Sequence, residues 1–513
     1  MVMLNADLHV EINNEGLTMD EFRAIVVGRK TVVISNESKE RVEQSHRYLQ
    51  EVLDSKQVVY GVNTGFGQLS TVILPDDQSG NLQLNLIRSH ACAVGEPYTE
   101  EIVRAITLLR LVSLTRGYSG VRPVVTDILA ELLNHGIHAV IPQQGSLGAS
   151  GDLAPLSHLA LVLLGEGEAY YQGERISGGE ALKRAGIQPI KLTAKEGLAL
   201  INGTQAMTAV GLLAYQKARF VEEAANVAVA LTMQALDGIL DAFSEEIQMV
   251  RPYPEQAETA RQIRHLLQGS GYIYGPNQGK VQDAYSIRCV PQVHGASMRA
   301  LNHVEDTLNI ELNAVTDNPT LFAAEHKVYS GGNFHGQPIA LAMDYMKIAV
   351  AEYANISERR TERLVNPQLS GGLPPFLTPE AGVSSGLMIL QYVSASLVSE
   401  NKVLAHPASV DSIPSSGNQE DHVSMGTTAA RQVNQIVDNA SHVLAIELIC
   451  AAQALEWKSH SKLSPVTQKV KAWIREIVPA YKADRVYSQE IQQLSEEIRS
   501  GRFHEKMASF LVV

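Results

Sequence analysis

The sequence predicts a mainly α-helical protein, in which a loop-rich N-terminal domain precedes a bundle of long helices. Helical periodicity continues through residues 208–250, 337–364 and 421–457, the last opened by a polar loop. The first of these stretches contains no proline and only two glycines. An ordinary globular helix has roughly 8–20 residues, so stretches of this length favour a bundle of long, nearly parallel helices.

The elements before the bundle are shorter and more varied. Residues 9–12 and 31–34 are β-like, and an amphipathic stretch follows at 38–54. Apolar side chains recur with helical spacing over 100–115, which predicts a helix there. The composition changes near residue 200 and, more weakly, near 460. We therefore expect three parts: an N-terminal domain at 1–200, the helix bundle at 201–460 and a more charged helical segment at 461–513.

The composition excludes several classes of protein. The 513 residues are 45% hydrophobic and carry a formal charge of −13, so they offer no basic surface for nucleic acid or an anionic membrane. No apolar run is long enough to cross a bilayer, and the N-terminal residues lack the pattern of a signal peptide. Three widely separated cysteines favour a reducing compartment. We therefore expect a cytoplasmic protein that binds neither nucleic acid nor membrane.

Six loops rich in Gly, Asn, Gln and Ser lie next to apolar helical segments, which makes them candidates for a shared site. They begin at Tyr60, Ile141, Ile201, Tyr272, Ser330 and Ser412. Common nucleotide and metal motifs are absent. Residues 275–280 (GPNQGK) lack the spacing of a Walker A motif, and the histidines never form HExxH. The sequence therefore predicts no metal or nucleotide cofactor.

The most distinctive segment is GSLGASGDLAPLSH, residues 145–158. Its central tripeptide Ala149-Ser150-Gly151 is common by itself, and alone it would indicate an ordinary turn or helix cap. The whole segment, however, resembles the prosthetic-group segment of the aromatic amino acid ammonia-lyases. The resemblance extends over nearly the whole chain and includes most of the polar loops, in the order that the family has them.

The tripeptide has the residues that a backbone cyclisation needs. The amide nitrogen of Gly151 can attack the carbonyl carbon of Ala149, because glycine has no Cβ and tolerates strained dihedral angles. Elimination of the Ser150 hydroxyl then leaves an exocyclic methylene, and two waters are lost in all. The resemblance implies that the product is a 4-methylideneimidazol-5-one (MIO) ring, an electrophile that no unmodified side chain supplies.

The resemblance also implies the helical architecture of the fumarase/aspartase-like superfamily, and a homotetramer in which loops from several subunits complete each site. Within the family, the sequence most resembles the branch that eliminates ammonia from L-histidine to give trans-urocanate. His90 stands where the phenylalanine branch has apolar residues, and Glu420 stands where the phenylalanine and tyrosine branches have glutamine. A carboxylate and an imidazole suit a substrate ring that has its own N–H and ring nitrogen.

Alternatives to this reading differ in chemistry or in class. The nearest is a tyrosine or phenylalanine ammonia-lyase, or an aminomutase, with the same prosthetic group. A lyase of the fumarase and aspartase type would keep the helical bundle without a modified backbone. A helical scaffold without activity would keep the fold and assemble, but form no urocanate.

Roles for single residues follow from the resemblance. It implies that the Arg288 guanidinium binds the substrate carboxylate, whose two oxygens fit its fork, and that Tyr60 is the candidate base for the β-proton. Without the resemblance, Arg288 would indicate a surface ion pair and Tyr60 a packed core tyrosine. The other implied site residues are Asn202 and Tyr285, which hold the ring and the substrate amine, and Gln282 and Phe334, which line the site. Which proton Tyr60 and Glu420 each remove is left open.

Overall fold

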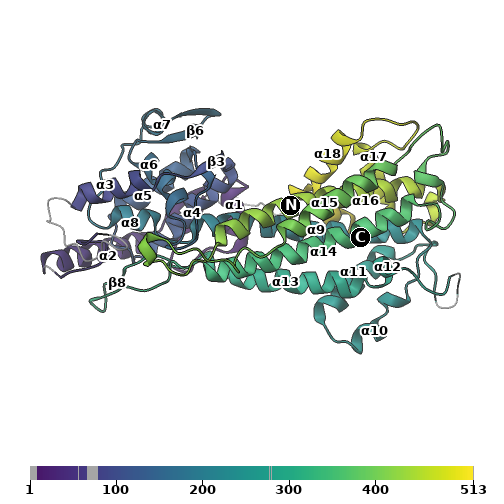
Figure 1. Ribbon diagram of the computed structural model, residues 1–513, viewed down its shortest axis with the longest axis horizontal. Coiled ribbons are helices and arrows are strands. Elements are labelled where there is room, and N and C mark those ends of the chain that lie inside the picture. Colours follow the sequence, from purple (N-terminus) through teal and green to yellow (C-terminus); the bar gives the residue numbers. More distant parts are fainter. Residues whose placement is uncertain (1–8, 56, 66–78, 276–277, 279, 512–513) are drawn as a thin grey trace, which may run out of the picture. The chain divides into compact units, whose positions relative to one another are not determined.

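The computed structural model describes residues 9–55, 57–65, 79–275, 278 and 280–511 (Figure 1). The predicted mainly α-helical fold is confirmed. Contacts within the chain divide it into two compact units. Unit 1 contains Met1–Leu212, Asp306–Ala342 and Pro407–Arg431, and unit 2 contains Leu213–Glu305, Met343–His406 and Gln432–Val513. The three parts expected from the composition are a different division of the same chain, and they stay a prediction.

Four long helices have residues in both units: α9 (Gln205–Ala235), α13 (Val290–Glu311), α14 (Gln337–Val365) and α16 (Gly426–Ala454). Unit 1 otherwise contains the shorter helices and the strands. Its helices are α1 (Met19–Val26), α2 (Asn36–Asp54), α3 (Ser79–His90), α4 (Glu100–Thr115), α5 (Pro123–His135), α6 (Leu153–Leu163), α7 (Gly178–Ala185), α8 (Glu196–Ile201) and the 3-10 helix η5 (Ser416–Asn418). Its strands are β1 (His9–Ile12), β2 (Thr31–Ile34), β3 (Val94–Pro97), β4 (His138–Ala139), β5 (Pro142–Gln144), β6 (Glu168–Tyr171), β7 (Glu174–Ser177), β8 (Thr320–Phe322) and β9 (Lys327–Tyr329).

The strands of unit 1 form small sheets around its helices. β1 pairs with β2 in parallel, β3 with β5 and β8 with β9 in antiparallel pairs, and β4, β6 and β7 form one antiparallel sheet. Helix α4 begins at a Thr99 cap and is buried from Ile102 to Thr115, where it packs against α5. Helices α3, α6 and α8 pack against one another. This second group of helices carries much of the candidate site.

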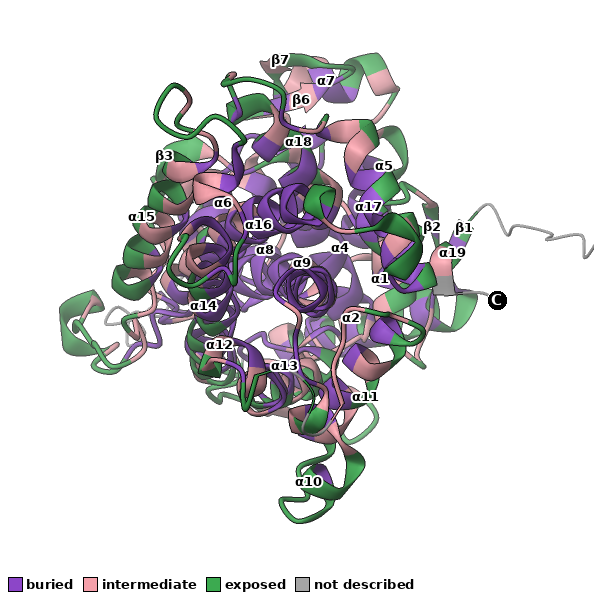
Figure 2. Ribbon diagram, turned by 90° about the vertical axis from the view of Figure 1, so that its right-hand side faces the viewer, coloured by how far each residue is buried: buried purple, intermediate pink, exposed green. Residues whose placement is uncertain are grey.

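Unit 2 is a helical bundle. Besides its parts of the four long helices, it contains α10 (Glu245–Met249), α11 (Pro254–Leu267), α12 (Tyr285–Arg288), α15 (Met388–Leu404), α17 (Pro465–Ile477), α18 (Ser488–Arg499), α19 (Arg502–Leu511) and the 3-10 helices η3 (Asp241–Phe243), η4 (Pro375–Leu377), η6 (Leu455–Trp457) and η7 (His460–Lys462). Figure 2 shows α9 end-on and buried, with α13, α14 and α16 around it. None of the helices in the described part of the chain is long and apolar enough to cross a membrane.

A buried ion pair connects three helices of this bundle. Arg360 of α14 donates two hydrogen bonds, of 2.6 and 2.7 Å, to the carboxylate of Glu447 on α16, and neither side chain is exposed. The same carboxylate accepts from the hydroxyls of Thr232 on α9 and Ser357 on α14. Because every lone-pair direction of Glu447 meets a donor, the charge is compensated, and the contacts fix how these helices are aligned.

Most of the elements predicted from periodicity are confirmed. Strands β1 and β2 and helix α4 have the predicted bounds, α14 ends one residue later than expected, and α16 with η6 covers the third long stretch after its polar loop. The prediction of one helix over 208–250 is wrong, because α9 ends at Ala235. The chain turns there through Asp237, which has a φ of 53°, and the Gly238 amide donates to the Met233 carbonyl. Apolar periodicity continues past this turn in η3 and α10, which hid the break from a sequence pattern.

Candidate active site

Unit 1 contains a cavity of about 720 Å³. Its lining comes from the segment after α2, from α3, from the turn before α6, from α8, and from the loops before α14 and α16. The residues are Tyr60, Gly65, Leu82, Asn85, Leu86, Ser89, His90, Ala149, Ser150, Leu153, Leu198, Ile201, Asn202, Asn318, Ser330, Gly331, Phe334, His335, Ser416, Gln419, Glu420, Asp421 and His422. The polar loops that the sequence singled out at Tyr60, Ile141, Ile201, Ser330 and Ser412 therefore meet in one place, although residues 66–70 of the first loop lie outside the described residues.

The turn Ala149–Gly151 contacts another backbone segment very closely. Gly151 has a φ of 74° and pairs with Gly203, and the Asp152 amide donates a 2.7 Å hydrogen bond to the Gly203 carbonyl. A Cβ on Gly151 would collide with that same carbonyl oxygen. Glycine at position 151 is therefore required both by the left-handed backbone conformation and by the neighbouring chain.

The buried carboxylate of Asp152 holds this turn in place. Asp152 is fully buried and accepts hydrogen bonds from the Ser146 hydroxyl at 2.8 Å, the Met207 amide at 2.8 Å and the Thr427 hydroxyl at 2.5 Å. Met207 lies in the first turn of α9 and Thr427 in the first turn of α16. Burial raises the pKa of the Asp152 carboxyl, while these donors oppose the shift. Asp152 thus joins the beginnings of two long helices to the turn that carries Ser150.

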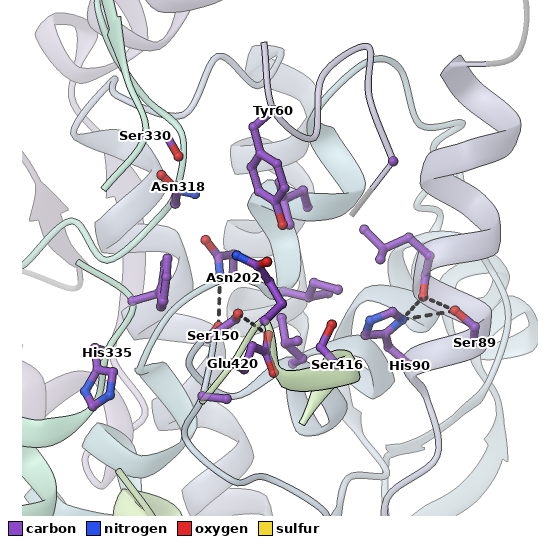
Figure 3. A pocket seen from close by; sticks show the side chains of 18 of the residues that line it. Tyr60, Ser89, His90, Ser150, Asn202, Asn318, Ser330, His335, Ser416 and Glu420 are labelled. Atoms are coloured by element: carbon purple, nitrogen blue, oxygen red, sulfur yellow. Dashed lines mark hydrogen bonds between the residues drawn. The ribbon is translucent and has the colours of Figure 1, made fainter. Parts of the chain in front are cut away.

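Two side chains hold Ser150 at its hydroxyl and at its carbonyl (Figure 3). The Ser150 hydroxyl donates a 2.7 Å hydrogen bond to Oε1 of Glu420, and Nδ2 of Asn202 donates a 2.8 Å hydrogen bond to the Ser150 carbonyl oxygen. The other oxygen of Glu420 accepts from the Ser415 hydroxyl at 2.7 Å. Figure 3 shows the phenol of Tyr60 pointing into the cavity toward this cluster. The predicted residues Tyr60, Ser150, Asn202 and Glu420 are therefore close together.

His90, the last residue of α3, has one ring nitrogen occupied. Its Nδ1 lies 2.8 Å from the Leu86 carbonyl oxygen and 3.0 Å from the Ser89 hydroxyl. A carbonyl oxygen only accepts, so Nδ1 carries the proton and Nε2 is an acceptor. Burial lowers the pKa of the His90 imidazole, opposed by the Leu86 carbonyl and the Glu420 charge. His90 is therefore neutral at neutral pH and presents an acceptor nitrogen.

The structure does not bring all the predicted residues together. Phe334 lines the cavity, but Gln282, Tyr285 and Arg288 belong to unit 2 and are not among its lining residues. Tyr285 and Arg288 form the ends of the short helix α12, where the guanidinium lies 4.5 Å from the centroid of the Tyr285 ring. The Tyr285 side chain is 70% exposed.

Several lining residues were not predicted individually. His335 and His422 have stacked rings, with centroids 5.6 Å apart, and Nε2 of His335 lies 3.2 Å from the His422 carbonyl oxygen. Both lie in polar loops that the sequence indicated, so position next to Phe334 and Glu420 was an available signal. Asn318 is buried and accepts from the Gly331 amide at 2.7 Å. No sequence pattern pointed to it.

The residues present fit a prosthetic group made from the backbone. The close Gly151–Gly203 contact holds the tripeptide in a tight turn, and donors and acceptors already surround Ser150. Within the described ranges, no group of three or more His, Cys, Asp or Glu side chains is placed to hold a metal ion.

Comparison with known proteins identifies the class. Residues 17–476 match the family model for aromatic amino acid lyases, so the chain belongs to the aromatic amino acid lyase family. It is an enzyme of the carbon–nitrogen lyase class.

Particular relatives are similar over nearly their whole length. The chain is 56% identical to the histidine ammonia-lyase of Geobacillus thermodenitrificans over 97% of this chain and 99% of the relative. Among solved structures, the histidine ammonia-lyase of Trypanosoma cruzi superposes with a TM-score of 0.91 at 41% identity, covering 98% of this chain and 95% of that one. The tyrosine aminomutase of Streptomyces globisporus has a TM-score of 0.94 at 36% identity, covering 98% and 99%.

Proposed function

We propose that this protein eliminates ammonia from L-histidine to give trans-urocanate. The observation that carries the proposal is the position of Glu420 and His90 in the same cavity as Ser150. A phenyl ring has no polar atom, so it would offer no hydrogen bond to Nε2 of His90 or to the Glu420 carboxylate, whereas an imidazole would. The 56% identity to a named histidine ammonia-lyase supports the same choice of substrate.

We infer that Ala149, Ser150 and Gly151 cyclise to an MIO group. The Gly151 nitrogen bonds to the carbonyl carbon of Ala149, and the carbonyl oxygen leaves as water with the amide protons of Gly151 and Ser150. The α-proton and hydroxyl of Ser150 then leave as a second water. In this family the group supplies an electrophile that makes the substrate's amino group a better leaving group. The tight Gly151–Gly203 contact and the hydrogen bonds to Ser150 support this inference.

The chain's own residues supply recognition and proton transfer. Nε2 of His90 accepts from the N–H of the substrate ring, because Nδ1 is already bonded to the Leu86 carbonyl. Tyr60 and Glu420 are the proton acceptors of the site, with Tyr60 the candidate for the β-proton. Phe334 is an apolar wall of the cavity. Asn202 holds the Ser150 carbonyl, and we propose that it also contacts the substrate amine.

We propose that the site is completed by other copies of the chain in a homotetramer. Arg288 would bind the substrate carboxylate, and Tyr285 and Gln282 would complete the wall, yet none of the three lines the cavity of unit 1. Unit 2 also exposes large apolar side chains along α14 and α15, which is unusual for a surface that stays in water. They are Tyr345, Ile348, Ile389, Tyr392 and Val393. A second copy would cover such a face and bring its own α12 to a neighbouring cavity.

We also propose a cytoplasmic location. Cys92, Cys289 and Cys450 are all free in the structure, as suits a reducing compartment.

The proposal is tested by incubating the wild-type protein and Ser150→Ala with L-histidine and following the absorbance of urocanate. The wild type should form urocanate, and its peptide containing Ser150 should be lighter by two waters. Ser150→Ala should lack both. Equal activity of the two proteins, or an unmodified wild-type peptide, would contradict the proposed chemistry.

A second candidate function is the aminomutase reaction, which the likeness to tyrosine aminomutase favours. Tyrosine and phenylalanine are therefore tested beside histidine, with chromatography of the products. A β-amino acid from tyrosine or phenylalanine, at a rate above that of urocanate formation, would establish this alternative.

A further inference from the structure

A buried arginine contacts Asn202, which lines the candidate site. Arg110 of α4 is fully buried. Its Nη1 donates two hydrogen bonds of 2.8 Å, one to the backbone carbonyl of Asn202 and one to the Gln205 side chain. Its Nε and Nη2 have no hydrogen-bond partner among the residues that the structure describes. Burying a charged group with unsatisfied donors is costly, so a fold seldom keeps one for packing alone.

A buried ion pair acts on Arg110 through its charge. Nζ of Lys195 lies 2.6 Å from Oδ2 of Asp317, and both side chains are fully buried. The charge of Asp317 favours the protonated forms of both Arg110 and Lys195, while burial opposes it. Burial lowers the pKa of Arg110 only to about 10, so its guanidinium stays charged at neutral pH. The Arg110 guanidinium therefore places a buried positive charge beside Asn202.

This charge is connected to Ser150 through a single residue. Lys195 precedes helix α8 and Asn202 follows it, so the helix carries both. Arg110 holds the backbone carbonyl of Asn202, and the Asn202 side chain donates a 2.8 Å hydrogen bond to the Ser150 carbonyl. Oδ1 of Asn202 accepts no hydrogen bond from the described residues. No donor therefore orients the side-chain amide through this oxygen.

The Ser150 carbonyl is where a positive charge has a chemical effect. Loss of the Ser150 hydroxyl requires loss of the proton on the adjacent Cα. A hydrogen bond to the carbonyl, in a field that is positive on the donor side, stabilises the electron density that this proton leaves behind. The same polarisation would make the methylene of the finished group more electrophilic.

We propose that Arg110 is a positioning residue for Asn202, and that through Asn202 it promotes the dehydration of Ser150. This inference rests on the proposed function, because it concerns the formation of the group made from residues 149–151. Gln205, which accepts from Arg110 and donates to the Thr316 hydroxyl at 2.9 Å, keeps the guanidinium in place.

The chain offers a matched control on the same helix. Arg104, also on α4, is 4% exposed and donates to the backbone carbonyls of Ile25, Leu133 and Lys30. None of these four residues lines the cavity. Arg104→Met therefore removes a buried guanidinium of the same helix without touching Asn202.

The experiment measures the mass of the peptide containing Ser150 in the folded, soluble fraction of wild type, Arg110→Met, Arg110→Lys and Arg104→Met. We expect Arg110→Met to reduce the two-water-loss fraction at least tenfold, and Arg110→Lys to give a value between those of the Met variant and the wild type. Arg104→Met should be modified as fully as the wild type. If Arg110→Met does not fold, Arg110→Lys decides the question.

The outcomes separate the inference from the proposed function. An unmodified wild-type peptide contradicts the proposed function. If the wild type and both Arg110 variants are modified to the same extent, the role of Arg110 is overturned and the proposed function stands. Equal loss in the Arg110 and Arg104 variants also overturns it, because the effect would then be one of folding. As a second readout, kcat for histidine should fall with the modified fraction, while KM stays within about twofold of the wild type.

Discussion

The hydroxyl of Ser150 donates a 2.7 Å hydrogen bond to the carboxylate of Glu420, 270 positions later in the sequence. Ser150 precedes α6, whereas Glu420 follows the short helix η5. The carboxylate thus lies within hydrogen-bond distance of the hydroxyl that the proposed modification would remove. Under the proposed function, Glu420 would act first beside the departing Ser150 hydroxyl and later beside the substrate.

Replacement of this carboxylate by an amide is the most direct test of its role. In Glu420→Gln the size is kept, but the charge and one acceptor are lost. Because a hydrogen bond to a charged group contributes about 1.5–3 kcal/mol, kcat/KM for L-histidine should fall about 10- to 100-fold. Steady-state rates with histidine and phenylalanine measure the effect. The control is Glu166→Gln, which removes a surface carboxylate paired with Arg88. An unchanged rate with histidine would show that the Glu420 carboxylate has no role in the reaction.

The close backbone contact at Gly151 predicts a steric effect. In Gly151→Ala the new Cβ would collide with the Gly203 carbonyl oxygen, at a backbone φ of 74°. We expect the variant to lose the two-water mass change and to unfold at a lower temperature than the wild type. Gly173→Ala is the matched control, since Gly173 has a φ of 82° but nothing within 4 Å of its added Cβ. Comparable losses in the two variants would assign the effect to the dihedral angle and not to the Gly203 contact.

Sharing of sites between copies predicts complementation. Ser150→Ala and Arg288→Met should each be inactive as homo-oligomers. If each site takes Ser150 from one copy and Arg288 from another, coexpression with random mixing should restore both residues in roughly a quarter of the sites. The measurement is the histidine-dependent rate of the purified mixed oligomers, compared with a mixture of the two separately purified variants. A coexpressed sample no more active than that mixture would show that the two residues belong to sites within one copy.

Much of the site was predictable because it lies in loops of unusual composition. A turn that brings two backbones into contact needs glycine, and a polar cavity needs amides and hydroxyls, so the segments around Gly151, Asn202 and Glu420 differ from their apolar neighbours. The long helices were predictable for a similar reason, since their periodicity extends over many turns. Family resemblance added the roles.

Other features depend on contacts that no local pattern contains. Arg110 lies on a helix whose apolar neighbours give no sign of a buried cation, and its partners Asn202 and Gln205 come from a distant segment. The end of α9 at Ala235 depends on the backbone of Asp237 and on the Gly238–Met233 hydrogen bond. Both were missed because tertiary structure, and not local propensity, decides them.

Burial of His138 predicts that stability depends on pH. His138 in β4 is 3% exposed, and burial lowers the pKa of its imidazole to about 4, opposed by Glu100 and assisted by Arg104 and Arg29. The unfolded chain binds a proton at this residue near pH 6.5, which the folded chain does not bind until about pH 4. The stability contribution is therefore fully present above pH 6.5 and is lost as the pH falls toward 4. At pH 5 the loss is about 2 kcal/mol.

His138→Gln removes this titration. The free energy of unfolding, measured in urea at one protein concentration, should decrease less between pH 7 and pH 5 in His138→Gln than in the wild type, by about 2 kcal/mol. The absolute stability of the variant can differ, but only the pH dependence reports the protonation of residue 138. His135→Gln is the control, because that histidine is exposed at the end of α5 and should leave the wild-type pH dependence nearly unchanged. Equal pH dependence in His138→Gln and the wild type would mean that the folded protein accepts a proton on His138 as readily as the unfolded chain does.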